Sequence, residues 1–207
     1  MENQNEWKQS NTHVFWGEMA PNDHLVQIYE DDEVVLDSLE GFVDSGLKIG
    51  DGVIVIAAPD HLTALNTRLI KQGYNLNQLR STHQYIPIDA YEALSKFMIN
   101  AWPDQLLFMK MVEGIIALAR GNNIRRVRAY GEMVAILWAQ GHNGATVQLE
   151  HLWNRVCQKE AFCLFCAYPK SGFTQDANTS IQHICSTHTK IISGLEGSTT
   201  EVFYKNV

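Results

Sequence analysis

Aromatic and acidic side chains follow several apolar runs of the chain, at the points where strands are expected to end. Tyr29 closes one run and is followed by four carboxylates at 30–33. Tyr130 closes a second run and is followed by a glycine and Glu132. Aromatic walls with a few convergent polar groups suit a small organic ligand. The pattern therefore predicts a binding pocket. The candidate ligand-binding residues are Tyr29, Glu30, Asp31, His61, Tyr130, Glu132 and Tyr168.

Several of these residues have two interpretations that the sequence leaves open. Glu132 has a functional interpretation, as a polar anchor in the pocket or as a relic of the acidic residue that handles magnesium and water in an ATPase. Its other interpretation is a first-turn glutamate that interacts favourably with a helix dipole. Each tyrosine either lines the pocket or packs its ring with the hydroxyl at the rim. The acids at 30–33 either hold a divalent cation or, as we favour, begin a helix and stay solvated. For His24 we favour a hydrogen-bonded structural role over titration near neutral pH.

The turn after Tyr29 lacks the groups that bind phosphate. An ATP-binding α/β domain places a glycine-rich loop with a lysine there, because backbone N–H groups and a cation must surround the phosphates. The carboxylates at 30–33 would instead repel a triphosphate in the absence of a metal. No glycine–lysine loop follows Ala58 either. We therefore expect no tight ATP binding and a sensor rather than an enzyme.

Cysteine and histidine spacing gives weak support for metal or redox chemistry. Cys163 and Cys166 have the spacing of a redox pair, but residues three apart on a strand face opposite sides. Cys185 and His188 would share one face of a helix, and with His183 they fall short of the four ligands of a structural zinc site. We favour a buried cysteine and an exposed histidine there. We expect four free thiols, no metal and no cofactor.

Apolar runs alternate with helical patterns along the chain. Crossover helices between strands are typical of parallel pairing, so the order predicts a three-layer, doubly wound, mainly parallel α/β sheet. In such sheets ligands bind beyond the carboxyl ends of the strands. Pro87 cannot donate to a ladder, which predicts that its strand lies at an edge or ends there. The expected strands are 25–29, 53–58, 84–88, 126–130 and 162–167, and the main expected helices are 34–47, 59–71, 104–119, 132–140, 145–157 and 179–192.

Charge and hydropathy narrow the classes of partner. The net charge of −7 argues against a broad nucleic-acid footprint, which needs a basic face. For the one basic run, 125–128, we favour a strand with alternating solvated arginines. No segment has the apolar length of a membrane span, and the start lacks a signal peptide's apolar core. We expect a cytoplasmic protein with no direct nucleic-acid or membrane partner.

Five segments of the chain together resemble the MEDS family, a sensory domain of methanogens and methylotrophs that is found in the dichloromethane-dehalogenase repressor. The resemblance covers roughly residues 13–192. It implies a RecA- or KaiC-like fold that has lost its ATP-binding motifs, and a sensor of small molecules coupled to histidine kinases or DNA-binding modules. We divide the chain into an N-terminal arm (1–20), a MEDS-like sensory domain (21–192) and a polar C-terminal tail (193–207). The segments are WGEMAP at 16–21, DHLVQIYEDD at 23–32, RAYGEMVAILW at 128–138, LEHLW at 149–153 and FCAYP at 165–169.

We expect a non-catalytic sensory domain that signals through a protein partner, such as a histidine kinase or a transcription regulator. A homodimer is also expected, because two-fold assembly is the commonest closed form. The aromatic arm 7–16 either contributes to that contact or folds back over its own domain. Two other functions remain open. One is an ATPase-derived hydrolase that uses Glu132 with a metal at Asp31 and Asp32. The other is a ligand-free interaction module acting on a kinase or a sigma-factor regulator.

Overall fold

Strands and helices alternate along the chain in the computed structural model, which describes residues 7–10, 16, 19–122, 125–172, 184, 188–194 and 200–205. The strands are β1 (Trp7–Ser10), β2 (His24–Tyr29), β3 (Gly52–Ala57), β4 (Tyr85–Asp89), β5 (Met98–Ile99), β6 (Trp102–Pro103), β7 (Val127–Gly131), β8 (Cys163–Pro169), β9 (Lys190–Gly194) and β10 (Thr200–Lys205). The helices are α1 (Asp32–Lys48), α2 (Pro59–Lys71), α3 (Leu76–Ser81), α4 (Ala90–Ser95), α5 (Gln105–Arg120), α6 (Met133–Ala139) and α7 (Asn143–Glu160).

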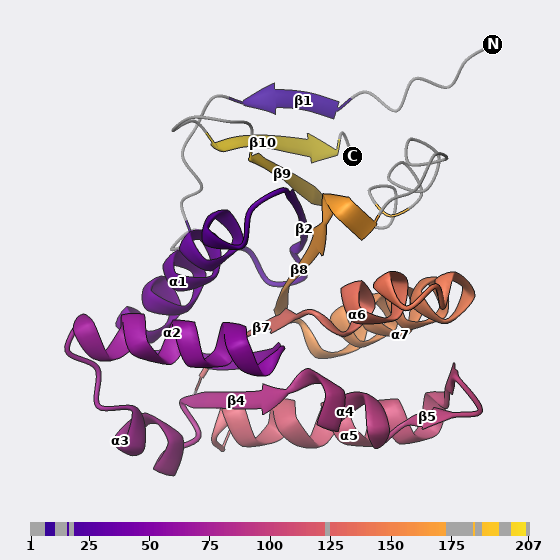
Figure 1. Ribbon diagram of the computed structural model, residues 1–207. Coiled ribbons are helices and arrows are strands. Elements are labelled where there is room, and N and C mark those ends of the chain that lie inside the picture. Colours follow the sequence, from indigo (N-terminus) through magenta and orange to yellow (C-terminus); the bar gives the residue numbers. More distant parts are fainter. Residues whose placement is uncertain are drawn as a thin grey trace.

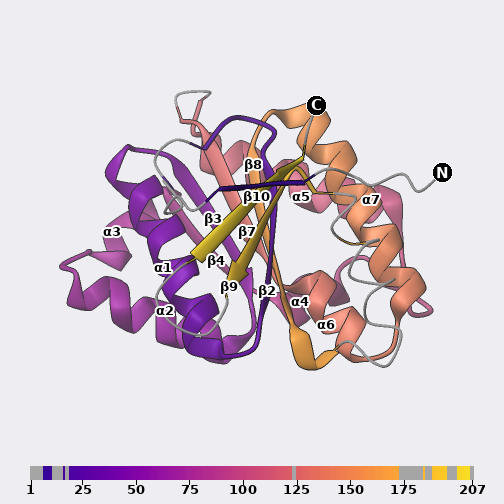
Figure 2. The ribbon, with the colours of Figure 1, turned by 90° about the horizontal axis from the view of Figure 1, so that it is seen from above.

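One sheet runs through the described part of the molecule, in the order β1-β10-β9-β2-β8-β7-β3-β4 (Figure 1). The strands from β9 to β4 pair in parallel, and β10 and β1 extend the β9 edge in antiparallel fashion. Helices α1 to α3 lie on one side of the sheet and α4 to α7 on the other (Figure 2). This arrangement confirms the expected three-layer, doubly wound α/β fold.

The two helical layers define two faces of the sheet, called here the α1 face and the α7 face. Strand β3 is buried along its whole length, as expected from its continuous apolar run. Its side chains alternate, with Val55 on the α1 face and Ile54 on the α7 face. Strand β4, which contains Pro87, lies at the sheet edge as predicted. Among the described residues, no helix combines the length and the apolar character needed to cross a membrane.

The basic run 125–128 differs from the expected strand with solvated arginines. Arg128 is only 2 % exposed. Its Nε and Nη2 atoms donate to Asp51 Oδ2 at 2.9 and 2.7 Å, and Nη1 donates to the carbonyl oxygens of Trp16 and Phe42. Arg126 remains largely exposed while contacting the same carboxylate. The expectation was wrong for Arg128 because its partners come from distant segments that the strand pattern does not contain.

The described parts of both chain ends fold onto their own domain. Trp16 packs against Phe42 and Phe165, with ring centroids 5.6 and 5.4 Å apart. Strand β1 pairs with β10, which lies within the expected polar tail. These contacts agree with the interpretation in which the aromatic arm folds back over its own domain. The helix expected over 179–192 is wrong for its last residues, because Lys190 begins β9 and pairs in parallel with Leu25 of β2.

We predict that Arg128→Met lowers the free energy of unfolding by about 3–5 kcal/mol, because it leaves the buried Asp51 carboxylate without its main partner. Urea unfolding followed by circular dichroism measures the change. The matched control is Arg126→Met, which removes an exposed arginine from the same carboxylate and should cost less than about 1 kcal/mol. Equal losses in the two variants would contradict the prediction.

Candidate functional site

Glu132 lies at the carboxyl end of β7, between that strand and α6. Its N–H donates to the Ile56 carbonyl at 2.9 Å, which fixes the turn against the end of β3. Its side chain is buried, and its carboxylate is surrounded by donors. Oε2 accepts from the Ala58 N–H at 2.8 Å, and Oε1 accepts from the Tyr130 hydroxyl at 2.7 Å. The turn therefore holds a buried carboxylate at the edge where ligands of doubly wound sheets bind.

His61 closes this arrangement from the first turn of α2. Its Nδ1 lies 2.6 Å from Glu132 Oε1, and its Nε2 lies 3.8 Å from Asp32 Oδ1 on α1. Its side chain is 15 % exposed, whereas that of Glu132 is 5 % exposed. The hydrogen bond with Glu132 raises the pKa of His61, and burial opposes that shift. A protonated imidazole therefore fits this position between two acids.

The two tyrosines of the cluster both feel the charge of Glu132, and Tyr130 donates its hydroxyl to that carboxylate. Burial, followed by the charge of Glu132, raises the pKa of Tyr130 well above its ordinary value. Burial and the charges of Glu132 and Asp32 likewise raise the pKa of Tyr29. Both phenols stay protonated at neutral pH. The cluster can therefore accept a donor or a cation, and its negative charge is unsuited to phosphate.

Four of the sequence-predicted residues are thus brought together on the α1 face: Tyr29, His61, Tyr130 and Glu132. Glu30 and Asp31 lie outside this group. Glu30 is exposed and forms an ion pair with Lys170, and Asp31 caps α1 by accepting from the Glu33 N–H.

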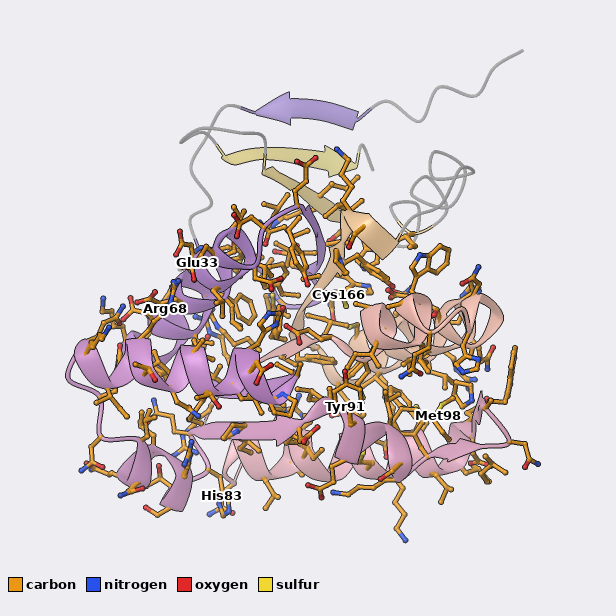
Figure 3. All side chains as sticks on the ribbon, viewed as in Figure 1. Glu33, Arg68, His83, Tyr91, Met98 and Cys166 are labelled. Atoms are coloured by element: carbon orange, nitrogen blue, oxygen red, sulfur yellow. The ribbon has the colours of Figure 1, made fainter. Side chains whose placement is uncertain are left out.

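The acidic run 30–33 also contributes to the contact between α1 and α2. Glu33 pairs with Arg68, and the two side chains face each other across these helices (Figure 3). Arg68 also contacts Asp37 and Glu40 of α1. The acids at 31 and 33 therefore serve local structure, in agreement with the favoured interpretation of a helix start.

Tyr168 lies on the opposite face of the sheet. It is in register with Ile28 of β2, one position before Tyr29, and the strand period of two turns it toward the α7 face. Its hydroxyl donates to Glu150. The expectation that Tyr29, Tyr130 and Tyr168 surround one cavity was therefore wrong for Tyr168.

A second buried polar cluster surrounds Glu150 on the α7 face. It consists of His24, Glu150, Cys166 and His188, and Cys166 lies in the interior of the molecule (Figure 3). Cys163 faces the other side, as the strand spacing predicted. His188 was expected to be exposed but is 1 % exposed. The expected hydrogen-bonded role of His24 is confirmed by Asn154 Oδ1, 2.8 Å from its Nδ1.

Sequence reasoning missed Glu150 although a signal was present. It lies among Leu149, Leu152 and Trp153, so one glutamate interrupts the apolar surface of α7. A charged residue in such a position is rarely buried without a partner. The cysteines Cys157, Cys163 and Cys166 are free thiols, and Cys185 and His183 lie outside the described residues.

We predict that His61 makes stability pH-dependent. Because its folded pKa is raised, the stabilisation is fully present below the unfolded pKa of about 6.5 and is lost as the pH rises through the folded value. His61→Gln should therefore destabilise the protein more at about pH 6 than at about pH 9. Urea unfolding at both pH values measures the difference. In a Glu132→Gln background the pH dependence of the His61→Gln effect should shrink, because Glu132 is the largest cause of the raised pKa and only Asp32 and Asp60 would remain. An undiminished pH dependence there would assign it to another group.

Two solved structures with a similar fold are proteins of Pyrococcus horikoshii OT3 and Methanocaldococcus jannaschii. A Pyrococcus horikoshii OT3 protein described as PH0250 matches with a TM-score of 0.54 and 10% identity, over 89% of this chain and 88% of that one. The flagellar accessory protein FlaH from Methanocaldococcus jannaschii matches with a TM-score of 0.50 and 9% identity, over 91% of this chain and 80% of that one. At these identities the likeness shows the fold alone, and it confirms the expected RecA-like architecture.

Comparison with known sequences identifies a family for this chain. No curated protein sequence matches the chain significantly. The model of the MEDS family, described as the methanogen/methylotroph, DcmR sensory domain, matches residues 23–189. The match includes β2 to β8 and both buried polar clusters. The chain therefore belongs to the MEDS family of sensory domains.

Proposed function

We propose that this sensory domain is non-catalytic, binds a small organic ligand around Glu132 and signals through a protein partner. Membership of the MEDS family supports a sensory or regulatory role. The observation that carries the location is the buried Glu132 carboxylate, which receives donors from the β3–α2 turn, from β7 and from α2. A carboxylate with preorganised neighbours at this edge suits a ligand that carries an N–H, O–H or ammonium donor.

His61 is the member of the cluster that a ligand would replace. Tyr130 is fully buried and the Ala58 donor belongs to the backbone, whereas the His61 side chain is partly exposed. A ligand donor in its place would keep Glu132 Oε1 paired while freeing the imidazole. Binding would therefore be coupled to movement of the first turn of α2.

Such a movement would reach the surface through the contact between α1 and α2. Arg68 of α2 pairs with Glu33, Asp37 and Glu40, which lie along α1. A ligand that binds the displaced arrangement better shifts the population toward it, by no more than its difference in affinity for the two arrangements. The exposed side of these helices would then present a changed surface to a histidine kinase, a transcription regulator or a second copy of the chain.

The rival functions fit the contacts less well. A hydrolase with a metal at Asp31 and Asp32 would need the Asp31 carboxylate, whose Oδ1 instead accepts the Glu33 N–H at the start of α1. It would also need the Glu132 carboxylate to be accessible to a metal or to water, but its Oε1 is hydrogen-bonded to Tyr130 and His61. A ligand-free interaction module would not account for the buried Glu132 carboxylate beside the partly exposed His61 side chain.

We predict that Glu132→Gln weakens binding of a small donor-bearing ligand at least tenfold, because losing a charge-assisted hydrogen bond costs about 1.5–3 kcal/mol. The probes are short-chain alcohols and alkylamines, titrated into labelled protein and followed by two-dimensional NMR. Shifts should centre on Ala58, His61 and Tyr130. Glu30→Gln, which removes an exposed carboxylate at the same sheet edge, should leave affinity unchanged. If no probe moves these amides, or if both variants bind equally, the site is elsewhere.

We also predict no micromolar binding of magnesium and ATP, which would correspond to about −8 kcal/mol. The Asp31 carboxylate already accepts an N–H from the first turn of α1, and Asp32 and Glu33 add negative charge there. Isothermal titration calorimetry of the whole chain measures the affinity. A micromolar dissociation constant would favour the ATPase-derived function over the sensory one.

A further inference from the structure

The second buried polar cluster brings together four side chains that commonly bind metals. His24 comes from β2, Glu150 from α7, Cys166 from β8, and His188 from the segment before β9. All four are at most 2 % exposed. They are also far apart in sequence, with 142 positions between His24 and Cys166. The fold, rather than a local motif, therefore builds this group.

The distances between their ligand atoms are close to those of a tetrahedral site. His24 Nε2 lies 3.5 Å from Cys166 Sγ and 3.7 Å from Glu150 Oε2, and His188 Nε2 also lies 3.7 Å from Glu150 Oε2. One ligand atom from each of the four residues lies within 4.8 Å of all the others. Ligands at about 2.0–2.3 Å around a tetrahedral zinc ion are themselves about 3.3–3.6 Å apart. Small side-chain adjustments would bring the group to that geometry.

Both imidazoles are held in the tautomer that a metal requires. His24 Nδ1 faces Asn154 Oδ1 at 2.8 Å, and His188 Nδ1 faces the Ile184 carbonyl at 2.7 Å. Each partner atom is an acceptor, so each Nδ1 carries the proton and each Nε2 presents its lone pair to the cluster. Metal-binding histidines in proteins are oriented in this way by a second hydrogen bond.

Glu150 provides the acidic ligand. Its Oε1 accepts from the Tyr168 hydroxyl, whereas its buried Oε2 has no hydrogen-bond partner among the described residues and points between the two imidazoles. An unpaired buried carboxylate oxygen is costly, and a cation at this position would remove that cost.

We propose that His24, Glu150, Cys166 and His188 form a zinc-binding site on the α7 face of the sheet. Two imidazoles, one thiolate and one carboxylate match the nitrogen, sulfur and oxygen ligands that zinc accepts in tetrahedral sites. Binding would release the Cys166 thiol proton to solvent. The proposal is independent of the ligand site around Glu132, which lies on the other face.

The surroundings of the cluster show which surface lies beside it and which elements a bound ion would connect. A surface hollow of ≈ 590 Å³ lies beside His24 and Asn154 and is lined mainly by residues of α7. Thr189 follows His188 and donates its N–H to the His24 carbonyl at 2.7 Å, at the start of β9. Zinc would therefore connect β9 to β2, β8 and α7.

The test uses the full chain after removal of metal with a chelator. Titration with Co²⁺ should saturate at one equivalent and give the visible absorption bands of tetrahedral cobalt, together with a thiolate-to-cobalt charge-transfer band. Zn²⁺ should displace the bound cobalt and raise Tm. Cys166→Ala should abolish the charge-transfer band and weaken zinc binding at least tenfold. The matched control is Cys163→Ala, a buried thiol on the same strand that faces the other side and should leave both unchanged.

Two further variants keep the test decisive if Cys166→Ala fails to fold. Glu150→Gln preserves shape and should weaken zinc binding, and Asn154→Ala should weaken it less, because it removes only the partner of His24 Nδ1. The absence of a charge-transfer band in the wild-type protein would overturn the proposal. So would zinc affinity that survives both Cys166→Ala and Glu150→Gln, which would place the ion at other residues.

Discussion

The buried guanidinium of Arg128 is the contact on which the α1 side of the molecule depends. It connects β7 to Asp51 before β3, to the Phe42 carbonyl of α1 and to the carbonyl of Trp16. A buried ion pair stabilises only when its geometry is good and its remaining donors are satisfied, and here they are. The helix must also pass close to it. A Cβ on Gly46 would lie 2.6 Å from Arg128 Cδ, so only glycine fits. This packing positions α1, and α1 in turn positions α2 and His61 through Arg68.

Strand periodicity and crossover order were sufficient to predict β2, β3, β4, β7 and β8 of the sheet, but not β1, β9 and β10. The fully apolar run of β3, the edge position of Pro87 and the missing glycine–lysine loop all follow from local chemistry, and each strand expected from the sequence is present within a few residues. The carboxyl-edge rule also placed Tyr130, Glu132 and His61 together. The same rule failed for Tyr168, because it specifies the edge of the sheet and not the face, and the face depends on register with β2.

Residues whose partners come from distant segments were beyond such reasoning. Arg128 appeared solvated because Asp51, Phe42 and Trp16 lie 77, 86 and 112 positions away. His188 appeared exposed because its helix was expected to continue where β9 begins. The two buried glutamates illustrate the contrast. Glu132 follows a strand end and could be singled out from sequence, whereas Glu150 is one residue within a helix, and its significance appears only when β2, β8 and β9 surround it.

The strand order has a consequence for how the chain folds during synthesis. Strands β3, β4 and β7 pair with one another using residues 52–131, so this half of the sheet can form early. Strand β2 is made before these strands but pairs with β8 and β9, whose residues come after position 162. Its pairing must wait until nearly the whole chain is available, and such long-range parallel contacts form slowly. Until then the open edge of β7 is exposed to other chains, which makes the emerging protein dependent on protection from aggregation.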